Sequence, residues 1–389
     1  MHILFARFHV VRIRSDLSVK LLNSVKTFEA MEGLCDRYSN KSGSGDKRMD
    51  GMRENESVVD LKAARKRFSR IGWMYVIGTI VINVAQYGVV YAVSYLRPEW
   101  LQNGNLYLLL SMLPMYLIGI PILILLMKMI PADPPVRRSM RAGEFVVSGI
   151  MCYSMMYIAN IIGNILTTVI GMFKGGQVNN QLLDVASSID IWMSLLFMVI
   201  CAPLVEEYVF RKLIVDRTIR YGQGVAIVTS GLMFGLFHGN LNQFIYAFVL
   251  GMFLAFLYVK TGNLKITIAL HMIVNFLGGV VSTLIMKLID LDEYVRILEN
   301  GMDQDILMTY VMEHLAGWIV FIVYFVFLVG VSIAGFVLLI VCFAQKKFKL
   351  EKSENVIPKG KGFLTAFLNV GMLVYTILWV GIIIFQLLQ

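Results

Sequence analysis

The sequence predicts an all-α fold, a polytopic transmembrane helical bundle of about eight or nine spans, and three observations support this class. Hydrophobic residues make up 58% of the 389 positions and charged residues only 16%, against roughly 25% in soluble domains. The mean hydropathy is +0.71. The apolar residues also come in long runs rather than periodic stripes, which is typical of helices that face lipid.

Nine apolar runs approach the roughly 20 residues that a helix needs to cross the hydrocarbon core. In chain order they lie near Ile71–Leu96, Leu106–Ile130, Glu144–Phe173, Ile189–Ile214, Gly224–His238, Gln243–Val259, Leu264–Met286, Gly317–Ala344 and Phe363–Leu388. The fifth is the shortest, so the alternative count is eight, with the fifth as a partial or tilted helix. Pro114 and Pro121 are expected to bend the second span.

Basic residues favour every second connecting segment. With nine spans, one set of segments carries 21 lysines and arginines, and the other carries four, Arg97, Lys174, Lys287 and Arg296. Because basic loops stay in the cytoplasm, we expect a multi-pass protein of the cell membrane with its N-terminus inside and its C-terminus outside. The lipid bilayer therefore explains the net charge of +9, and nucleic acid is not an expected partner.

Residues 1–69 differ from the rest of the chain and are predicted to be a cytoplasmic, largely disordered extension. The stretch Ser39–Asp50 is polar and rich in glycine and serine, a composition that disfavours a packed core. Arginines interrupt Met1–Arg14, so it lacks the unbroken apolar core of a signal peptide.

Few ionisable side chains fall inside the predicted spans. Such a group costs about 2.5–3.5 kcal/mol at the centre of a spanning helix and is by default a candidate functional residue. Away from the span ends, the acids are Glu206 and Glu207, and the histidines that fall within or at the end of spans are His238 and His271. Asn275 lies one helical turn after His271.

Helical spacing separates the two acids. Glu207 and Arg211 are four residues apart, in the favourable order for an ion pair on one face. Glu206 points about 100° away and lacks that partner. The same spacing places His271 and Asn275 on one face of their helix.

The fifth run has its own pattern. Phe234, one turn before His238, is expected to wall one side of a pocket, while Gly231, Gly235 and Gly239 form a ridge that lets helices approach closely. Counted at 1.5 Å per residue from the inner span ends, Glu206 lies about 12 Å deep, His271 about 10 Å and His238 about 21 Å. The fifth helix must therefore start below the membrane or tilt if these residues are to meet.

One carboxylate, two imidazoles and one amide suit hydrolysis of an amide bond. A carboxylate or imidazole takes the proton from water, and an imidazole or amide donates to the developing oxyanion. The trio Glu206, His238 and His271 is alternatively a zinc ligand set with an open position. The structural alternatives are a carboxylate that shares Arg211 and, for His271 and Asn275, hydrogen bonds between helices.

Three motifs resemble the CPBP family of intramembrane metalloproteases, the CAAX prenyl endopeptidase and bacteriocin-processing family that is also called Abi. EEYVFR at Glu206–Arg211 resembles its EExxxR motif, FGLFH at Phe234–His238 its FxxxH motif, and HMIVN at His271–Asn275 its HxxxN motif. The resemblance covers roughly Ile189–Leu284, and the order and spacing of the motifs fit.

The resemblance implies an intramembrane endopeptidase with a CAAX prenyl endopeptidase-like core. It implies that Glu206, assisted by His238, activates water, while His271 and Asn275 stabilise the oxyanion. The supporting residues that it implies are Glu207, Arg211 and Phe234. Zinc is an expected cofactor only if Glu206, His238 and His271 bind a metal, and a metal-independent glutamate mechanism is equally implied.

The expected substrates are membrane-associated peptides or proteins, in bacteriocin or pheromone processing or self-immunity. The alternatives are a non-catalytic membrane scaffold or immunity protein on the same fold, and then a transporter. After the extension, the chain is predicted to divide into N-terminal transmembrane helices (70–188), a catalytic core (189–286), an extracytoplasmic segment of short amphipathic helices (287–316) and C-terminal transmembrane helices (317–389).

Overall fold

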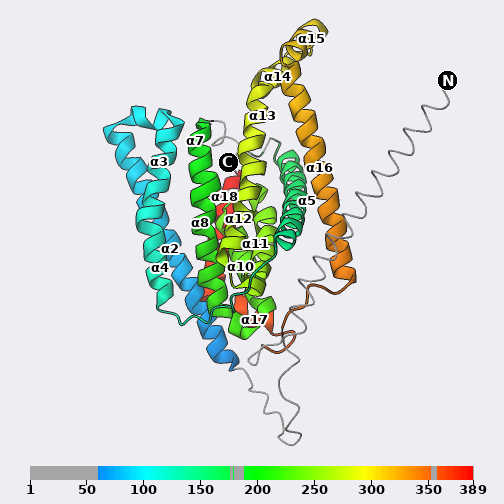
Figure 1. Cartoon of the computed structure of the whole chain (residues 1–389). Helices are drawn as coiled ribbons and strands as arrows, with labels where there is room; N and C mark the ends of the chain where they lie inside the picture. The colour runs from blue at the N-terminus through cyan, green and yellow to red at the C-terminus, as the bar shows by residue number, and fades with distance from the viewer. Residues whose placement is uncertain (1–59, 176–177, 179–187, 352–356, 389) are drawn as a thin grey trace, which may run out of the picture.

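The computed structural model describes residues 60–175, 178, 188–351 and 357–388, which form a multi-pass helical bundle without strands (Figure 1). Eight helices are long and apolar enough to cross a membrane: Leu61–Leu96, Gly104–Lys128, Ala142–Lys174, Ile191–Tyr221, Leu241–Thr261, Leu264–Leu288, Leu315–Ala344 and Val370–Leu388. The fifth predicted run is α10 (Gln223–Phe237), which has only 15 residues and measures about 22 Å. The alternative count of eight spans, with a partial fifth helix, is therefore confirmed.

The spans are α2 (Leu61–Leu96), α5 (Ala142–Lys174), α11 (Leu241–Thr261), α16 (Leu315–Ala344), α18 (Val370–Leu388) and three composite helices. The second span joins α3 (Gly104–Pro114), η2 (Met115–Gly119) and α4 (Ile120–Lys128). The fourth joins α7 (Ile191–Ser194), η3 (Leu195–Cys201), α8 (Ala202–Glu206), η4 (Glu207–Val215), α9 (Asp216–Thr218) and η5 (Ile219–Tyr221). The sixth in the count of eight joins α12 (Leu264–Asn275), η6 (Phe276–Val281) and α13 (Ser282–Leu288). Outside the spans lie η1 (Pro98–Gln102), α14 (Leu291–Glu299), α15 (Gln304–Glu313) and α17 (Gly362–Phe367).

The first helix starts earlier than predicted. Asp60 caps α2, because its Oδ1 accepts the backbone N–H groups of Lys62 and Ala63 at 2.9 and 3.1 Å. Ala64 and Phe68 are fully buried in the main core. The prediction of a disordered extension is therefore wrong for residues 61–69. Residues 1–59, including the glycine- and serine-rich stretch, lie outside the described part of the chain.

The last predicted span, near Phe363–Leu388, is broken in two. Arg65 donates from Nε and Nη2 to the Leu368 carbonyl at 3.1 and 2.6 Å. Asn369 then accepts the N–H of Met372 at 3.1 Å through its Oδ1, which is the bond that a helix N-cap makes. These three hydrogen bonds pair backbone groups at the break between α17 and α18, so that only α18 spans the bundle.

The fourth span contains two π-helical stretches, η3 and η4, on either side of α8. Such stretches are frequent at functional sites in proteins. Neighbouring helices bind two carbonyl oxygens of η4: the Tyr75 hydroxyl donates to Val209 at 2.6 Å and the Ser230 hydroxyl donates to Phe210 at 2.9 Å. The second span also has a π stretch, η2, directly after Pro114, where the two prolines predicted a bend.

Glycines bring α10 and α11 into close contact. A Cβ atom on Gly231 would lie 2.9 Å from the backbone nitrogen of Met252, and one on Gly235 would lie 3.0 Å from the Phe244 carbonyl oxygen. The predicted ridge is confirmed for these two residues. It is wrong for Gly239, because α10 ends at Phe237 and Gly239 adopts a φ of +68° in the following turn.

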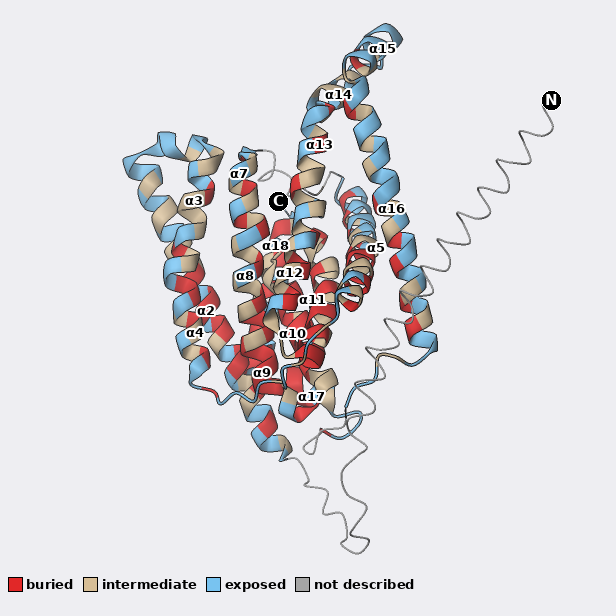
Figure 2. Cartoon of the chain, viewed as in Figure 1, coloured by how far each residue is buried: buried red, intermediate tan, exposed pale blue. Residues whose placement is uncertain are grey.

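The hairpin of α10 and α11 lies at the centre of the bundle (Figure 1). Helix α5 packs between α11 and α16, and α2 packs between α18 and the second span. Figure 2 shows buried residues gathered on α8 to α12, whereas α14 and α15 are largely exposed. The main core joins residues of α2, η4 and α18, such as Tyr75, Phe210 and Tyr375, so packing crosses the segment boundaries predicted from sequence.

Candidate active site

A fully buried ion pair lies at the junction of α8 and η4. The Arg211 Nη2 atom is 2.9 Å from Glu207 Oε1, and neither side chain is exposed. The ion pair predicted from the four-residue spacing is thus present, and Glu206 is not part of it. Arg211 is one of the 21 basic residues that the sequence assigned to the connecting segments. This assignment is wrong, because the fourth span continues to Tyr221 and Arg211 lies inside it.

His271 on α12 joins this pair to Glu206. Its Nδ1 is 2.9 Å from Glu207 Oε1, and an ionised carboxylate only accepts, so Nδ1 carries the proton of that bond. Its Nε2 therefore faces Glu206, whose Oε2 lies 3.7 Å away. A carboxylate that orients an imidazole in this way is a common supporting device in catalytic sites. Glu207 thus fixes the ring that meets Glu206.

Phe234 forms the wall between the two imidazoles. Its ring stands nearly perpendicular to that of His238, at a centroid distance of 4.7 Å, and to that of His271, at 5.8 Å. The Arg211 guanidinium carbon lies 4.4 Å from the same ring centroid. Gly251 on α11 leaves room for this ring, since a Cβ there would lie 2.8 Å from Phe234 Cδ1.

His238 lies directly after the last residue of α10. Its Nδ1 is 2.9 Å from the Phe234 carbonyl oxygen, which only accepts, so Nδ1 carries the proton and Nε2 is left as an acceptor in the neutral ring. Glu206 lies fifteen residues before Tyr221 and His238 fifteen residues after Gln223. The depth mismatch predicted from sequence is therefore absent, because the fourth span ends at Tyr221 and not at Ile214.

Asn275 faces the fourth span, as His271 does. Its Nδ2 donates to the Met198 carbonyl at 2.9 Å. Met198 lies in π-helical η3, where each carbonyl pairs with the N–H five residues later, and that residue is Pro203, which has no N–H. One amide hydrogen of Asn275 therefore replaces a missing backbone donor, and the second remains for another acceptor.

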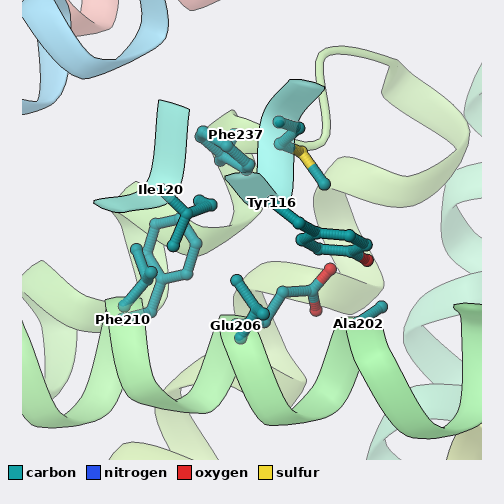
Figure 3. Close-up of a pocket in the computed structure, with 9 residues that line it drawn as sticks. Tyr116, Ile120, Ala202, Glu206, Phe210 and Phe237 are labelled. Carbon is teal, nitrogen blue, oxygen red and sulfur yellow. The ribbon is translucent and has the colours of Figure 1, made fainter. Parts of the chain in front are cut away.

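A cavity of about 30 Å³ lies beside Glu206 (Figure 3). It is lined by Met115, Tyr116, Ile120, Ala202, Val205, Glu206, Val209, Phe210 and Phe237. The Glu206 side chain is 24% exposed, unlike the neighbouring Glu207. Because a water needs about 10–15 Å³ of such space, the carboxylate has room for one beside it. Nothing in the sequence singles out Tyr116, although Pro114 and Pro121 mark the irregular helix that carries it.

The predicted metal ligands do not form a complete set. Glu206 Oε2 and His271 Nε2, 3.7 Å apart, are spaced like two ligands that each lie about 2.0–2.2 Å from one tetrahedral zinc ion. Within the described residues, however, only Asp290, Glu293 and His314 bring three ligand atoms within 4.8 Å of one another. His238 therefore does not complete a metal site with Glu206 and His271 in this structure. The arrangement of these three side chains does not fit a zinc ion.

Residues 188–277 match the family described as type II CAAX prenyl endopeptidase Rce1-like. The chain carries an Rce1-like segment. All three motifs lie within it, so the resemblance predicted from them is confirmed. The segment begins just before α7 and ends just after α12, and it thus contains the Glu207–Arg211 pair, both imidazoles and Asn275.

Two bacterial proteins are similar to part of the chain. The membrane-embedded CAAX protease MroQ of Staphylococcus aureus (strain USA300) is 29% identical over 133 residues, which are 32% of this chain and 51% of that protein. The putative membrane peptidase YdiL of Bacillus subtilis (strain 168) is 26% identical over 124 residues, 31% of this chain and 49% of that protein. The chain therefore spans about half the length of the curated relatives that it matches. No solved structure matches it significantly.

Proposed function

We propose that this protein is an intramembrane endopeptidase in which Glu206 activates a water molecule for attack on a peptide bond. The observation that carries the proposal is the contact of Glu206 with His271, beside a cavity large enough for water. The buried Glu207–Arg211 pair holds the His271 ring in place through Glu207. The names of the two relatives, a protease and a peptidase, support the same reaction class.

The proposed reaction proceeds through a tetrahedral intermediate. The water oxygen bonds to the peptide carbonyl carbon while one water proton passes to the Glu206 carboxylate. When the C–N bond breaks, the same proton passes from Glu206 to the leaving amine nitrogen. His238 Nε2, which carries no proton in the neutral ring, assists Glu206 as an alternative acceptor for the same water proton.

Two donors suit the oxyanion. The second amide hydrogen of Asn275 is one donor. His271 Nε2 is the other when the ring is an imidazolium, which carries a proton on Nε2 as well as the Nδ1 proton that bonds to Glu207. Donors that are fixed in a water-poor site before the reaction stabilise developing charge far better than solvent does. Glu207 and Arg211 then act only by holding His271, which makes them positioning residues.

The proposed mechanism uses no metal ion, because His238 does not complete a ligand set with Glu206 and His271 in the described residues. The substrates that we propose are membrane-associated peptides or proteins. The proposed roles are bacteriocin or pheromone processing or self-immunity. The cell membrane is the proposed location.

The decisive substitution is Glu206→Gln, which keeps the side-chain volume and removes the base. Membranes from cells with the intact protein should contain new peptide termini that are absent from cells with Glu206→Gln. The reason is that loss of a general base typically slows the reaction by about 10²–10⁴-fold. Quantitative mass spectrometry of membrane peptides measures this. Glu299→Gln, at an exposed position on α14, is the matched control and should leave every terminus in place.

Two results would contradict the proposal. Termini that form equally with Glu206→Gln would reject hydrolysis by this residue and favour the scaffold. If purified protein in liposomes loses cleavage of the same junction when 1,10-phenanthroline is added and regains it with zinc, the metal-free mechanism is wrong.

A further inference from the structure

Tyr116 lies in the centre of the second span, within the π-helical stretch η2 that follows Pro114. Its ring stacks on Phe197 of η3, with centroids 6.2 Å apart and planes inclined by 8°. Phe197 is itself buried, so the Tyr116 ring is held from one side by the same span that carries Glu206. The irregular helix and this stacked ring together fix where the phenol hydroxyl lies.

Tyr116 lines the same cavity as Glu206. Of the nine side chains that line it, only those of Tyr116 and Glu206 carry oxygen, and the other seven are apolar. Figure 3 shows the Glu206 carboxylate directed toward the Tyr116 ring across this space. A water in the cavity therefore finds two side-chain oxygens as partners, one on each of two helices.

No direct hydrogen bond joins the two side chains. Among the described residues, none forms a hydrogen bond with the Tyr116 hydroxyl. Two polar groups that lie near each other without a direct hydrogen bond are commonly bridged by water. The volume of about 30 Å³ exceeds the 10–15 Å³ that one water needs.

We propose that the Tyr116 hydroxyl orients the water that Glu206 activates. One water O–H donates to the Glu206 carboxylate and the other donates to the phenol oxygen, which has lone pairs to accept it. With both protons engaged, a lone pair of the water is left to face the peptide carbonyl carbon. Only the proton bound to Glu206 moves in the reaction, and Tyr116 keeps its own. This inference rests on the proposed function.

The test is Tyr116→Phe, which removes the hydroxyl and keeps the ring stacked on Phe197. The substrate is a synthetic quenched peptide that spans a junction cut in cells with the intact protein and uncut with Glu206→Gln. We expect kcat to fall about 10-fold, the effect of one lost hydrogen bond, with KM unchanged. Tyr107→Phe is the matched control, because it removes a hydroxyl from the same span at an exposed position.

The outcomes separate the two proposals. Unchanged kcat in Tyr116→Phe, together with inactive Glu206→Gln, would overturn the role of Tyr116 and leave the proposed function intact. A lower unfolding temperature with KM and kcat changed in parallel would show a structural role and also overturn it. An equally active Glu206→Gln protein would instead remove the proposed function.

Discussion

Glu206 and Glu207 are adjacent in the chain but have different surroundings. Glu207 is fully buried and binds both Arg211 and His271 through one oxygen, Oε1. Glu206 is partly exposed beside a cavity, and among the described residues its ion-pair partner is the Nε2 nitrogen of His271. The rotation of about 100° between successive helical residues directs the Glu207 carboxylate into the protein core and the Glu206 carboxylate toward the cavity.

Glu207→Gln therefore tests structure and not chemistry. The amide leaves the buried Arg211 guanidinium without a counter-charge, and loss of one partner of a buried ion pair costs about 3–5 kcal/mol. We expect a clearly lower unfolding temperature in detergent, measured by intrinsic fluorescence. Glu206→Gln, which leaves that pair intact, is the matched control and should unfold near the wild-type temperature. Equal unfolding temperatures for the two variants would show that the ion pair does not stabilise the bundle.

At the scale of elements, the short helix α10 places His238 beside the other site residues. The helix begins just after the fourth span ends at Tyr221 and stops at Phe237. His238 therefore lies as many residues after this turn as Glu206 lies before it. Its close contact with α11 depends on glycine, because Gly231 leaves no space for a Cβ atom against the Met252 backbone.

Gly231→Ala should separate α10 from α11. The added Cβ would lie 2.9 Å from the Met252 nitrogen, and such overpacking typically costs about 1–3 kcal/mol. We expect a lower unfolding temperature and slower cleavage, since Phe234 and His238 are carried by the same helix. The control is Gly88→Ala on α2, where a Cβ meets nothing within 4 Å. If Gly231→Ala is as stable as Gly88→Ala, the packing of α10 against α11 does not depend on a glycine at position 231.

At the scale of the whole molecule, the start of α2 and the end of α18 lie toward opposite ends of the bundle (Figure 1). The chain changes direction at each helix of the core, and α10 counts as one pass in this alternation although it is too short to span. The opposite placement of the two ends therefore agrees with an odd number of passes through the bundle.

The orientation that the basic residues predict has a direct test. Because the basic segments favour the cytoplasm, we expect alkaline phosphatase fused after Leu388 to be active and a green fluorescent protein fused at the same place to be dark. The same pair fused after Lys346, at the basic end of α16, should give the opposite result. Fusions after Leu388 that fluoresce would place the C-terminus inside and refute the predicted topology.

Local patterns in the sequence were sufficient for the membrane class, the spans and the Glu207–Arg211 pair. Long apolar runs and four-residue spacing act within a single helix, so these features need no knowledge of packing. The beginning of α2, the break before α18 and the turn at Gly239 were missed, because capping bonds and contacts with other helices decide where those helices begin and end.

The position of Tyr116 beside Glu206, the bond from Asn275 to Met198 and the equal depth of His238 and Glu206 depend on tertiary structure. Each joins side chains of different helices, and their distances depend on how those helices pack and where each one stops. The amino-acid sequence alone therefore identified most of the chemical groups, whereas the folded bundle decided which of them meet and what space remains between them.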